Sequence, residues 1–372
     1  MATHEIRVDY SRPLTGEPEK GHNRWHPDVP PVVRCRPGDE VLMETRDAFD
    51  LQITKDSSPD DVAAANLNVV HPLTGPVSVE GAEPGDLLVA EIVEVAAPSF
   101  GFTVQVPGFG FLRDEFPDPY IAKWDIAEGW ATSKDLPRVR IPGAPFMGTI
   151  GLAPSRDLMA EAARREQEAL DRGGFVLPPD PTDAVPSDGA IAGEAIRTIP
   201  PRENVGNVDI KHLAAGTRLL MPVWVEGALF SAGDAHFAQG DCETCGTAIE
   251  MNATLRVRFD LRKGRAAERR IRDLQFERDD YVVPPEYQAP RRFFATTGIS
   301  VGRDGRNEPE DVTVAARNAL LNMIDHLEAE YGYTRQQAYA ICSVAVDLRI
   351  SEVVDVPNFV VSALLPLDIF TA

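Results

Sequence analysis

Apolar and polar side chains alternate at every position of one stretch, Ile249-Glu250-Met251-Asn252-Ala253-Thr254-Leu255-Arg256-Val257-Arg258-Phe259-Asp260-Leu261. Successive side chains of a β-strand point to opposite faces of a sheet, so a period of two predicts a long strand with one apolar and one polar face. A second strand is predicted over 219–225, where apolar residues run together. These two segments favour a mainly β fold in the second half of the chain.

Two turn motifs predict strands near the start of the chain. Arg36-Pro37-Gly38-Asp39 precedes the apolar-rich segment 41–45, and Glu83-Pro84-Gly85-Asp86 precedes 87–95. Pro presets φ for the second position of a tight turn and Gly supplies the positive φ that a type II turn needs next, so each motif is typical of a turn before a strand. The segment 96–150 is rich in Gly, Pro and aromatic residues, which predicts irregular structure between short strands.

Three segments carry helix signals. Ser155 can cap a helix that ends at residues 173 and 174, both glycine, and a near-helical spacing of apolar residues predicts a helix over 311–331. Thr334 can cap a shorter helix that reaches to about residue 341. Residues 177–201 are dense in Pro, Asp and Gly, which indicates a long surface loop or a connection between domains. We therefore expect a domain boundary near residue 200.

The length and net charge of the chain exclude some classes of function. A chain of 372 residues with 43% hydrophobic residues is long enough for two or three folded units. It carries 37 Lys and Arg against 58 Asp and Glu, a formal net charge of −21. Such an acidic surface repels phosphate backbones and anionic lipids, so we expect neither nucleic acid nor a membrane as a partner. A neutral or cationic small molecule is the favoured ligand.

The N-terminal residues and the number of cysteines indicate the cellular compartment. Residues 1–12 are charged and contain no apolar core of the kind found in signal peptides, and four cysteines are too few for a disulfide framework in a chain of this length. The longest stretches without a charged residue are interrupted by Asn, Gln, Pro and Gly, so none is typical of a membrane span. We expect a cytoplasmic protein.

Polar residues that could serve a site gather in 200–211. Asn207, Asp209 and Lys211 lie two positions apart, so in an extended segment their amide, carboxylate and ammonium groups share one face. The simpler interpretation is a loop in which Asn and Asp satisfy their own backbone. Both interpretations remain open at this stage.

A second cluster begins at Gly233-Asp234-Ala235-His236. An Asp-x-His pair in an extended chain points both side chains the same way, which suits two ligands of one zinc ion. Three glycines in 233–246 would let the backbone approach a bound group closely. Most single histidines are structural, but these neighbours favour a metal site that includes Asp234 and His236.

Three further residues of this cluster allow competing roles. Glu250 opens the polar face of the long strand, where it is either a solvated carboxylate or, if that face lines a cavity, a metal ligand or general base, with Asp241 as the reserve candidate for the base. Cys242 or Cys245 could instead act as an acyl-transfer nucleophile with His236 as its base. A redox pair is disfavoured because a strand, not a helix, follows the two cysteines.

Several motifs in order make the sequence similar to the acetamidase/formamidase family of amide hydrolases. No single motif is specific, but the ordered set is. The matching segments are Gly21-His22-Asn23-Arg24-Trp25-His26-Pro27-Asp28, Thr74-Gly75-Pro76, Val79-Glu80-Gly81-Ala82-Glu83-Pro84-Gly85-Asp86, Gly148-Thr149-Ile150-Gly151-Leu152-Ala153-Pro154, Pro201-Arg202-Glu203-Asn204, Gly206-Asn207, Asp209-Ile210-Lys211, Gly233-Asp234, His236, Gln239-Gly240-Asp241, Glu243, Cys245-Gly246 and Ile249-Glu250.

This resemblance implies a β-rich enzyme that hydrolyses short carboxamides to ammonia and the acid and assembles as a homo-oligomer. It implies a mainly β fold with an α+β part: a jelly-roll-like β-sandwich with one helix over 1–200, and a barrel-like β part with a small C-terminal α+β part over 201–372, where most of the site lies. It also implies a divalent metal, zinc or alternatively calcium.

The first hypothesis is therefore metal-assisted hydrolysis of an amide of the acetamide or formamide type. The others are a metal-free cysteine amidase and an inactive protein that binds small amides. For the first, the expected roles are metal ligation by Asp209, Asp234 and His236, catalysis by Glu250, Lys211 and Asp241, and substrate binding by Asn207, Gln239 and His71.

Overall fold

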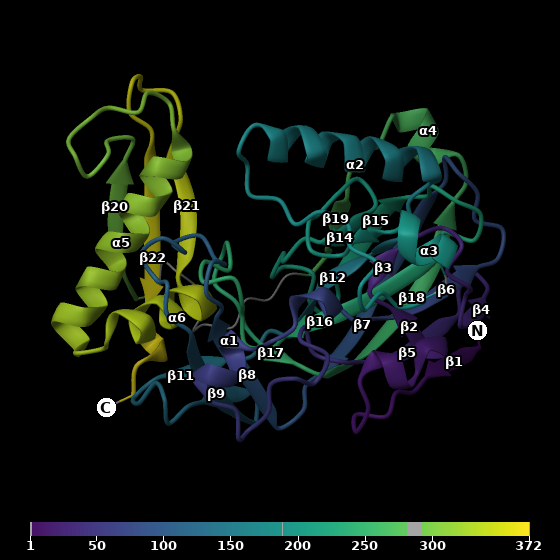
Figure 1. Ribbon diagram of the computed structural model, residues 1–372, viewed down its shortest axis with the longest axis horizontal. Coiled ribbons are helices and arrows are strands. Elements are labelled where there is room, and N and C mark those ends of the chain that lie inside the picture. The colour runs from purple at the N-terminus through teal and green to yellow at the C-terminus, as the bar shows by residue number, and fades with distance from the viewer. Residues whose placement is uncertain (1, 188, 281–291, 372) are drawn as a thin grey trace.

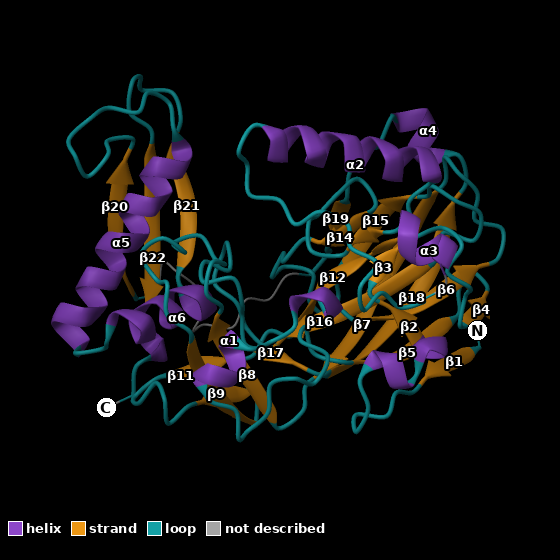
Figure 2. Ribbon diagram, in the orientation of Figure 1, coloured by secondary structure: helices purple, strands orange, loops and turns teal. Residues whose placement is uncertain are grey.

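The chain folds into packed β-sheets and a smaller α+β part that lies to one side of them (Figure 1). The computed structural model describes residues 2–187, 189–280 and 292–371. The described residues form more strands than helices. The long helices lie at the periphery of the sheets (Figure 2). The expected mainly β class with an α+β part is confirmed.

A six-stranded sheet contains most of the stretch that alternates between 249 and 261. Its order is β1-β5-β18-β7-β15-β19, and every neighbouring pair is antiparallel except β1 with β5. The two strands expected after the Pro-Gly turns are present here as β5 and β7. The strands are β1 (Thr3–Ile6), β5 (Glu40–Thr45), β7 (Leu87–Ala96), β15 (Arg218–Pro222), β18 (Ala253–Arg262) and β19 (Gln275–Glu277).

An eleven-stranded sheet carries the strands that matter for the site. Its main path is β11-β10-β9-β8-β17-β16-β12-β14, and β6 pairs with β16, β2 and β4 off this path. The strands are β2 (Gly21–His22), β4 (Val33–Cys35), β6 (Leu73–Val79), β8 (Phe100–Gln105), β9 (Tyr120–Ala127), β10 (Trp130–Thr132), β11 (Arg140–Pro142), β12 (Phe146–Leu152), β14 (Val205–Asn207), β16 (Phe230–His236) and β17 (Glu250–Met251).

The two large sheets share one apolar core. Phe230 of β16 and Phe259 of β18 meet edge to face with ring centroids 5.0 Å apart, and both side chains are fully buried. The expected barrel-like part is not found among the described residues. A barrel requires the end strands of a sheet to pair, whereas β1 and β19 end the six-stranded order without pairing with each other. Alternation in sequence is common to sandwiches and barrels, so it could not separate the two.

The C-terminal α+β part contains a three-stranded sheet covered by helices (Figure 1). Both helices expected here are confirmed: Asp311 caps α5, Gly332 ends it at φ 73°, and a Thr334–Gln337 capping box begins α6. The elements are β20 (Phe293–Ile299), α5 (Val312–Tyr331), α6 (Arg335–Ala345), β21 (Asp347–Glu352) and β22 (Val360–Pro366).

The remaining elements connect these parts. The helix expected after Ser155 is confirmed as α2, and the Ser155 hydroxyl accepts a hydrogen bond from the Leu158 amide at 3.2 Å. None of the helices in the described ranges is long and apolar enough to cross a membrane. The elements are α1 (Pro59–Ala63), α2 (Arg156–Asp171), α3 (Gly189–Glu194), α4 (Arg265–Arg269), the strand pair β3 (Arg24–Trp25) and β13 (Ile196–Arg197), and 3-10 helices at Leu14–Gly16, Pro18–Lys20, Leu67–Val69 and Leu367–Ile369.

Candidate functional site

Strand β16 presents two of the predicted ligands from the middle of the eleven-stranded sheet. Asp234 and His236 both lie in this fully buried strand, and Asp234 has a φ of 55°. The pairs Met147–Ala235 and Thr149–Gly233 place Gly148 of β12 opposite Asp234. The strand therefore brings an acidic and an imidazole side chain into the interior, next to a residue that has no side chain.

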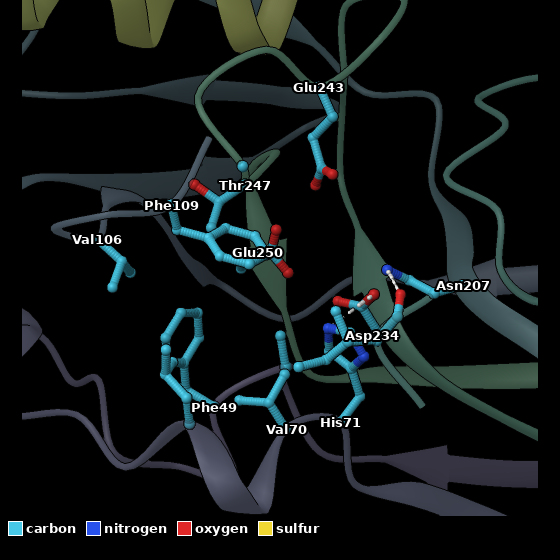
Figure 3. Close-up of a pocket in the computed structure, with 14 residues that line it drawn as sticks. Phe49, Val70, His71, Val106, Phe109, Asn207, Asp234, Glu243, Thr247 and Glu250 are labelled. Carbon is cyan, nitrogen blue, oxygen red and sulfur yellow. Dashed lines mark hydrogen bonds and ion pairs between the residues drawn. The ribbon is translucent and has the colours of Figure 1, made fainter. Parts of the chain in front are cut away.

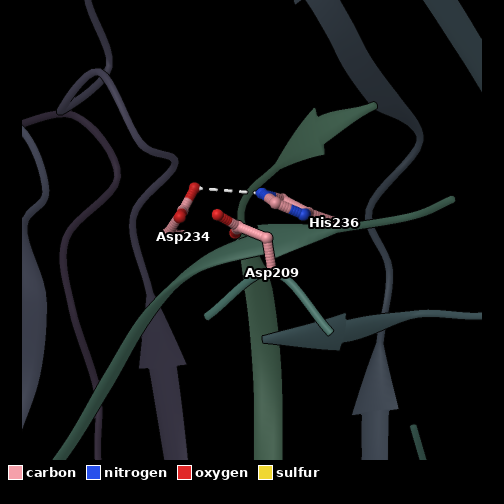
Figure 4. Close-up of side chains that lie close together, drawn as sticks. All are labelled: Asp209, Asp234 and His236. Atoms are coloured by element: carbon pink, nitrogen blue, oxygen red, sulfur yellow. Dashed lines mark hydrogen bonds and ion pairs between the residues drawn. The ribbon is translucent and has the colours of Figure 1, made fainter. Parts of the chain in front are cut away.

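Asp209 completes a compact group with Asp234 and His236 (Figure 4). One ligand atom from each residue lies within 4.8 Å of the others, and Nε2 of His236 is 3.2 Å from Oδ1 of Asp234. Oδ1 of Asp209 is buried without a hydrogen-bond partner among the described residues. This orphaned oxygen is a first indication that a cation fits here, because buried polar atoms otherwise find partners.

Gly148 forms the floor of this group. A Cβ at Gly148 would lie 2.6 Å from Oδ1 of Asp209, 2.8 Å from Oδ2 of Asp234 and 2.7 Å from Cε1 of His236. Any other residue would fill the space that these three side chains face. The motif Gly148-Thr149-Ile150-Gly151 thus has a direct structural reason at its first position.

Two glutamates extend the group around the same nitrogen of the imidazole. Nε2 of His236 lies 3.4 Å from Oε1 of Glu250 and 3.6 Å from Oε1 of Glu243. Oε1 of Glu250 accepts a hydrogen bond from the Ala248 amide at 2.8 Å, while its Oε2 is buried without a partner among the described residues. His236, Glu243 and Glu250 form a second set with the spacing of metal ligands.

Burial and mutual repulsion perturb the carboxylates of this cluster. Burial raises the pKa of Glu250 to about 8 and that of Asp209 to about 7, and it raises the pKa of Glu243 well above its usual value with help from Asp209. Burial would also raise the pKa of Asp234, but the neighbouring His71 and His236 hold it below its usual value. Several protons are therefore retained in the metal-free cluster, and a divalent cation would displace them.

Charged neighbours outweigh burial at the imidazole of His236. Burial alone would lower its pKa, but Glu250 and Asp234 raise it well above its usual value. Gln239 contacts the far side of the ring: its Oε1 is 2.8 Å from Nδ1, and its Nε2 donates to the backbone carbonyl of Asp209 at 2.7 Å. Gln239, expected to bind substrate, is placed to orient His236 and Asp209.

Asp234, Glu243 and Glu250 of this cluster line a small cavity of about 70 Å³ (Figure 3). His71 lines it with Nε2 3.7 Å from Oδ2 of Asp234, and burial lowers the pKa of His71. Asn207 also lines it, and its Oδ1 is 2.6 Å from the hydroxyl of Thr149, which is 3.1 Å from Oδ2 of Asp234. The lining residues are Ala48, Phe49, Leu67, Val70, His71, Val106, Phe109, Ile199, Asn207, Asp234, Glu243, Gly246, Thr247 and Glu250.

Two of the residues expected to be catalytic, Lys211 and Asp241, lie outside the cavity lining. Nζ of Lys211 pairs with Asp347 at the start of β21 and lies 3.4 Å from Oδ1 of Asp241. Neither Lys211 nor Asp241 is among the residues that line the cavity. The spacing of Asn207, Asp209 and Lys211 suggested one shared face, but Asp209 adopts a φ of 47°, so the segment is not extended there.

The cysteines also lie outside the cavity lining. Cys245 is buried, and its thiol is 3.5 Å from the carbonyl oxygens of Val104 and Thr247. Burial raises the pKa of Cys245 to about 11, which keeps the thiol protonated at neutral pH. Cys242 is exposed on the loop. This placement weighs against a thiol nucleophile.

Helix α6 holds the loop 239–247, which carries Glu243. The hydroxyl of Ser343 accepts a hydrogen bond from the Cys245 amide at 3.0 Å, and the hydroxyl of Tyr339 donates to the carbonyl oxygen of Thr244. Both helical side chains are buried. The C-terminal part thus fixes one wall of a site whose other residues come from the large sheet.

Sequence reasoning missed several contributors to the site. Glu243 was named among the residues that match the family, but no role in the site was assigned to it. Phe49 and Phe109 come from segments far from the cluster in sequence, and no local pattern distinguishes them from core residues. Gly148 belongs to one of the motifs that match the family, but no role was assigned to it.

Comparisons with known proteins agree on one family. The acetamidase/formamidase family model matches residues 7–372. The acetamidase of Mycolicibacterium smegmatis is 39% identical over 361 residues, with 90% of this chain and 87% of that protein covered. The formamidase of Methylophilus methylotrophus is 36% identical over 385 residues, covering 98% of this chain and 93% of that protein.

Solved structures extend the comparison to three dimensions. A gamma lactamase from Delftia acidovorans superposes with a TM-score of 0.94 at 37% identity, covering 100% of this chain and 94% of that chain. An acetamidase from Bacillus halodurans gives a TM-score of 0.56 at 26% identity and covers 94% and 96% of the two chains. The overall arrangement is thus closely shared with the first of these proteins.

Proposed function

The chain belongs to the acetamidase/formamidase family of amidases, and from this premise we propose that it hydrolyses short carboxamides of the acetamide or formamide type with the help of a divalent metal. The products are ammonia and the carboxylic acid. One observation carries the proposal: His236 lies within a group of four carboxylates, three of which line a small cavity whose lining is otherwise mostly apolar.

Cavity size supports a small substrate. A volume of about 70 Å³ holds roughly five water-sized groups, if each needs about 15 Å³. Formamide and acetamide have about three and four non-hydrogen atoms, so either fits this space. The apolar side chains provide a surface for an acyl group, and the acidic cluster provides partners for the amide nitrogen.

The donor set fits a divalent cation. Asp209 and Glu250 each carry a buried oxygen that has no hydrogen-bond partner within the described ranges, and Gly148 leaves the space between the ligands free of its own side-chain atoms. Imidazole with carboxylates suits zinc, whereas calcium prefers oxygen ligands alone, so we propose zinc, held by Asp209, Asp234 and His236. An ion in this position supplies a Lewis acid for the amide oxygen and makes a water more acidic.

The protein residues then divide the remaining tasks. Glu250 and Glu243 face the cavity next to the ligand group and are the proposed proton acceptors. Glu250 is the first candidate because its Oε2 has no hydrogen-bond partner in the part of the chain that the structure describes. Asn207 and His71 line the cavity and are proposed to hold the amide. The catalytic roles expected for Lys211 and Asp241 receive no support from the cavity lining, and the ion pairs of Lys211 with Asp241 and Asp347 account for their position.

A cyclic amide is the second candidate substrate. The structure with a TM-score of 0.94 belongs to a gamma lactamase, and opening a lactam breaks the same C–N bond without releasing ammonia. The small volume of the cavity favours the smaller linear amides. A homo-oligomeric assembly and a boundary near residue 200 stay predictions of the sequence.

The deciding experiment measures hydrolysis and metal content together. Purified protein is assayed for ammonia release from formamide, acetamide and propionamide, and for ring opening of a γ-lactam, before and after chelation and after zinc or calcium is restored. We expect ammonia release that chelation abolishes and zinc restores. Activity that survives removal of the metal but is lost on thiol alkylation would replace the proposal with the cysteine mechanism, and binding of amides without turnover would indicate an inactive binding protein.

A further inference from the structure

One wall of the cavity is formed by apolar side chains. A primary amide has a polar carboxamide end and an apolar acyl end, so its acyl group would face this wall when the carboxamide faces Asp234 and Glu250. Figure 3 shows Phe49 and Val106 on the side away from Asp234, and the Phe109 ring overlaps Glu250 in this view. The apolar wall comprises Phe49, Leu67, Val70, Val106, Phe109 and Ile199.

Phe109 occupies the boundary between this wall and the exterior. Its ring rests against Gly246, where a Cβ would lie 2.9 Å from Cδ1 of Phe109. On its outer side the ring meets Phe175 edge to face, with centroids 6.1 Å apart, and Phe175 is 55% exposed. The half-buried Phe109 ring therefore closes the cavity with solvent-accessible side chains behind it.

The loop that carries Phe109 is tied to the loop of Glu243. The Phe109 amide donates to the Val106 carbonyl at 3.0 Å, which closes a tight turn, and the Phe111 amide donates to the Thr244 carbonyl at 3.0 Å. Gly110 has a φ of 93°, and a Cβ there would lie 2.7 Å from the carbonyl oxygen of Cys245. The ring is thus held at a fixed place relative to the acidic wall.

We propose that Phe109 determines the largest acyl group that the site accepts. This inference rests on the proposed amidase function and adds the residue that sets its substrate range. Because the cavity holds roughly five water-sized groups, an acyl chain longer than that of propionamide must displace the Phe109 ring. Removing the ring opens the cavity toward Phe175 and leaves the acidic wall in place.

The test compares acyl chain lengths in matched variants. kcat/KM is measured for formamide, acetamide, propionamide and butyramide with the wild-type holoenzyme, Phe109→Ala, Phe109→Leu and Phe111→Ala. We expect the butyramide-to-acetamide ratio of kcat/KM to rise at least about tenfold in Phe109→Ala, since one methylene in a pocket is worth about 10- to 200-fold. A smaller rise is expected in Phe109→Leu. Phe111→Ala removes the same ring from the same loop without touching the cavity lining and should leave the ratio unchanged.

Each other outcome decides against the inference. An unchanged ratio in the Phe109 variants that still hydrolyse acetamide overturns it, and so does an equal rise in Phe111→Ala, which would indicate general loosening of the loop. If Phe109→Ala fails to fold, as judged by thermal unfolding, Phe109→Leu decides alone. A wild-type protein that hydrolyses no amide of the series overturns the proposed function first and this inference with it.

Discussion

Oε1 of Gln239 lies 2.8 Å from Nδ1 of His236, and the amide nitrogen of Gln239 donates to the backbone of Asp209 at 2.7 Å. The amide oxygen can only accept, so Nδ1 must carry a proton. The other ring nitrogen, Nε2, therefore faces Asp234, Glu243 and Glu250. One buried amide thus fixes the orientation of the imidazole and the position of a second proposed ligand.

Gln239→Leu should weaken metal binding by about 10- to 100-fold, which is typical when a residue that orients a metal ligand is lost. The variant removes both hydrogen bonds while it keeps the volume similar. Zinc affinity is measured by competition with a chelator of known affinity. Gln105→Leu, which removes another buried amide in β8, is the control and should retain wild-type affinity. Equal affinities for wild type and Gln239→Leu would contradict the orienting role.

Asp234→Asn and His236→Ala should each lower bound metal and amidase activity together, because each removes a charge or donor atom from the proposed ligand group. The loss of metal affinity should exceed about 100-fold, more than a supporting residue causes. Metal content is measured by elemental analysis beside the ammonia assay. Asp86→Asn changes another buried carboxylate, one that pairs with Lys263, and should keep its metal. Full metal occupancy in the first two variants would refute the ligand assignment.

Metal affinity should rise with pH. In the metal-free protein the pKa of Asp209 is raised to about 7 and that of Glu250 to about 8 by burial, so both carboxyl groups hold protons at pH 6. Zinc must displace these protons at pH 6 but fewer of them at pH 8, which makes binding weaker in acid. We expect the apparent Kd for zinc to fall by at least about tenfold from pH 6 to pH 8. An affinity that is constant over this range would show that these carboxyl groups do not exchange protons for metal.

The double variant Cys242→Ser with Cys245→Ser should retain metal content and mechanism. Cys245 is buried with a raised pKa and Cys242 is exposed, and neither lines the cavity. The expected cost is a loss of about 1 kcal/mol in the free energy of unfolding, typical of point changes. Loss of a nucleophile would instead lower kcat by several orders of magnitude. Such a collapse with folding and metal intact would restore the cysteine mechanism.

His22 should make the fold sensitive to mild acid. It is fully buried in β2 with Nε2 2.8 Å from the Ser231 hydroxyl, and burial lowers its pKa to about 4. In the unfolded chain His22 takes up a proton near pH 6.5. The contribution of neutral, buried His22 to the free energy of unfolding is therefore complete above that pH and is lost as the pH falls toward 4. From pH 7.5 to pH 5 this group lowers the free energy of unfolding by about 2 kcal/mol. Urea unfolding at both pH values should show a smaller loss in His22→Gln; equal losses would contradict the assignment.

Local patterns predicted the elements whose type or ends are specified by a short stretch of sequence. The alternation over 249–261 became β17 and β18, broken at Asn252, whose side-chain oxygen accepts a hydrogen bond from the Asp47 amide. The helix caps at Ser155, Asp311 and Thr334 were confirmed because a cap depends on residues within one turn.

The site was predictable only where its residues are close in sequence. Asp234 and His236 share one strand, and their spacing alone brings them together. Glu250 illustrates the limit: it begins the polar face of a strand, yet pairing of β17 between β8 and β16 buries it beside His236. Which strand becomes a neighbour depends on long-range pairing, and periodicity carries no information about that.

The contacts of α6 with the loop 239–247 have a consequence for the order in which the site is completed. Translation delivers all the proposed ligands by residue 250, but the helix that fixes the Glu243 loop ends at Ala345, roughly 95 residues later. At about 5 to 20 residues per second, this delay is roughly 5 to 20 s. During that interval the nascent chain holds the ligand residues without the helix that immobilises one wall, so the finished geometry is acquired only after the C-terminal part has left the ribosome.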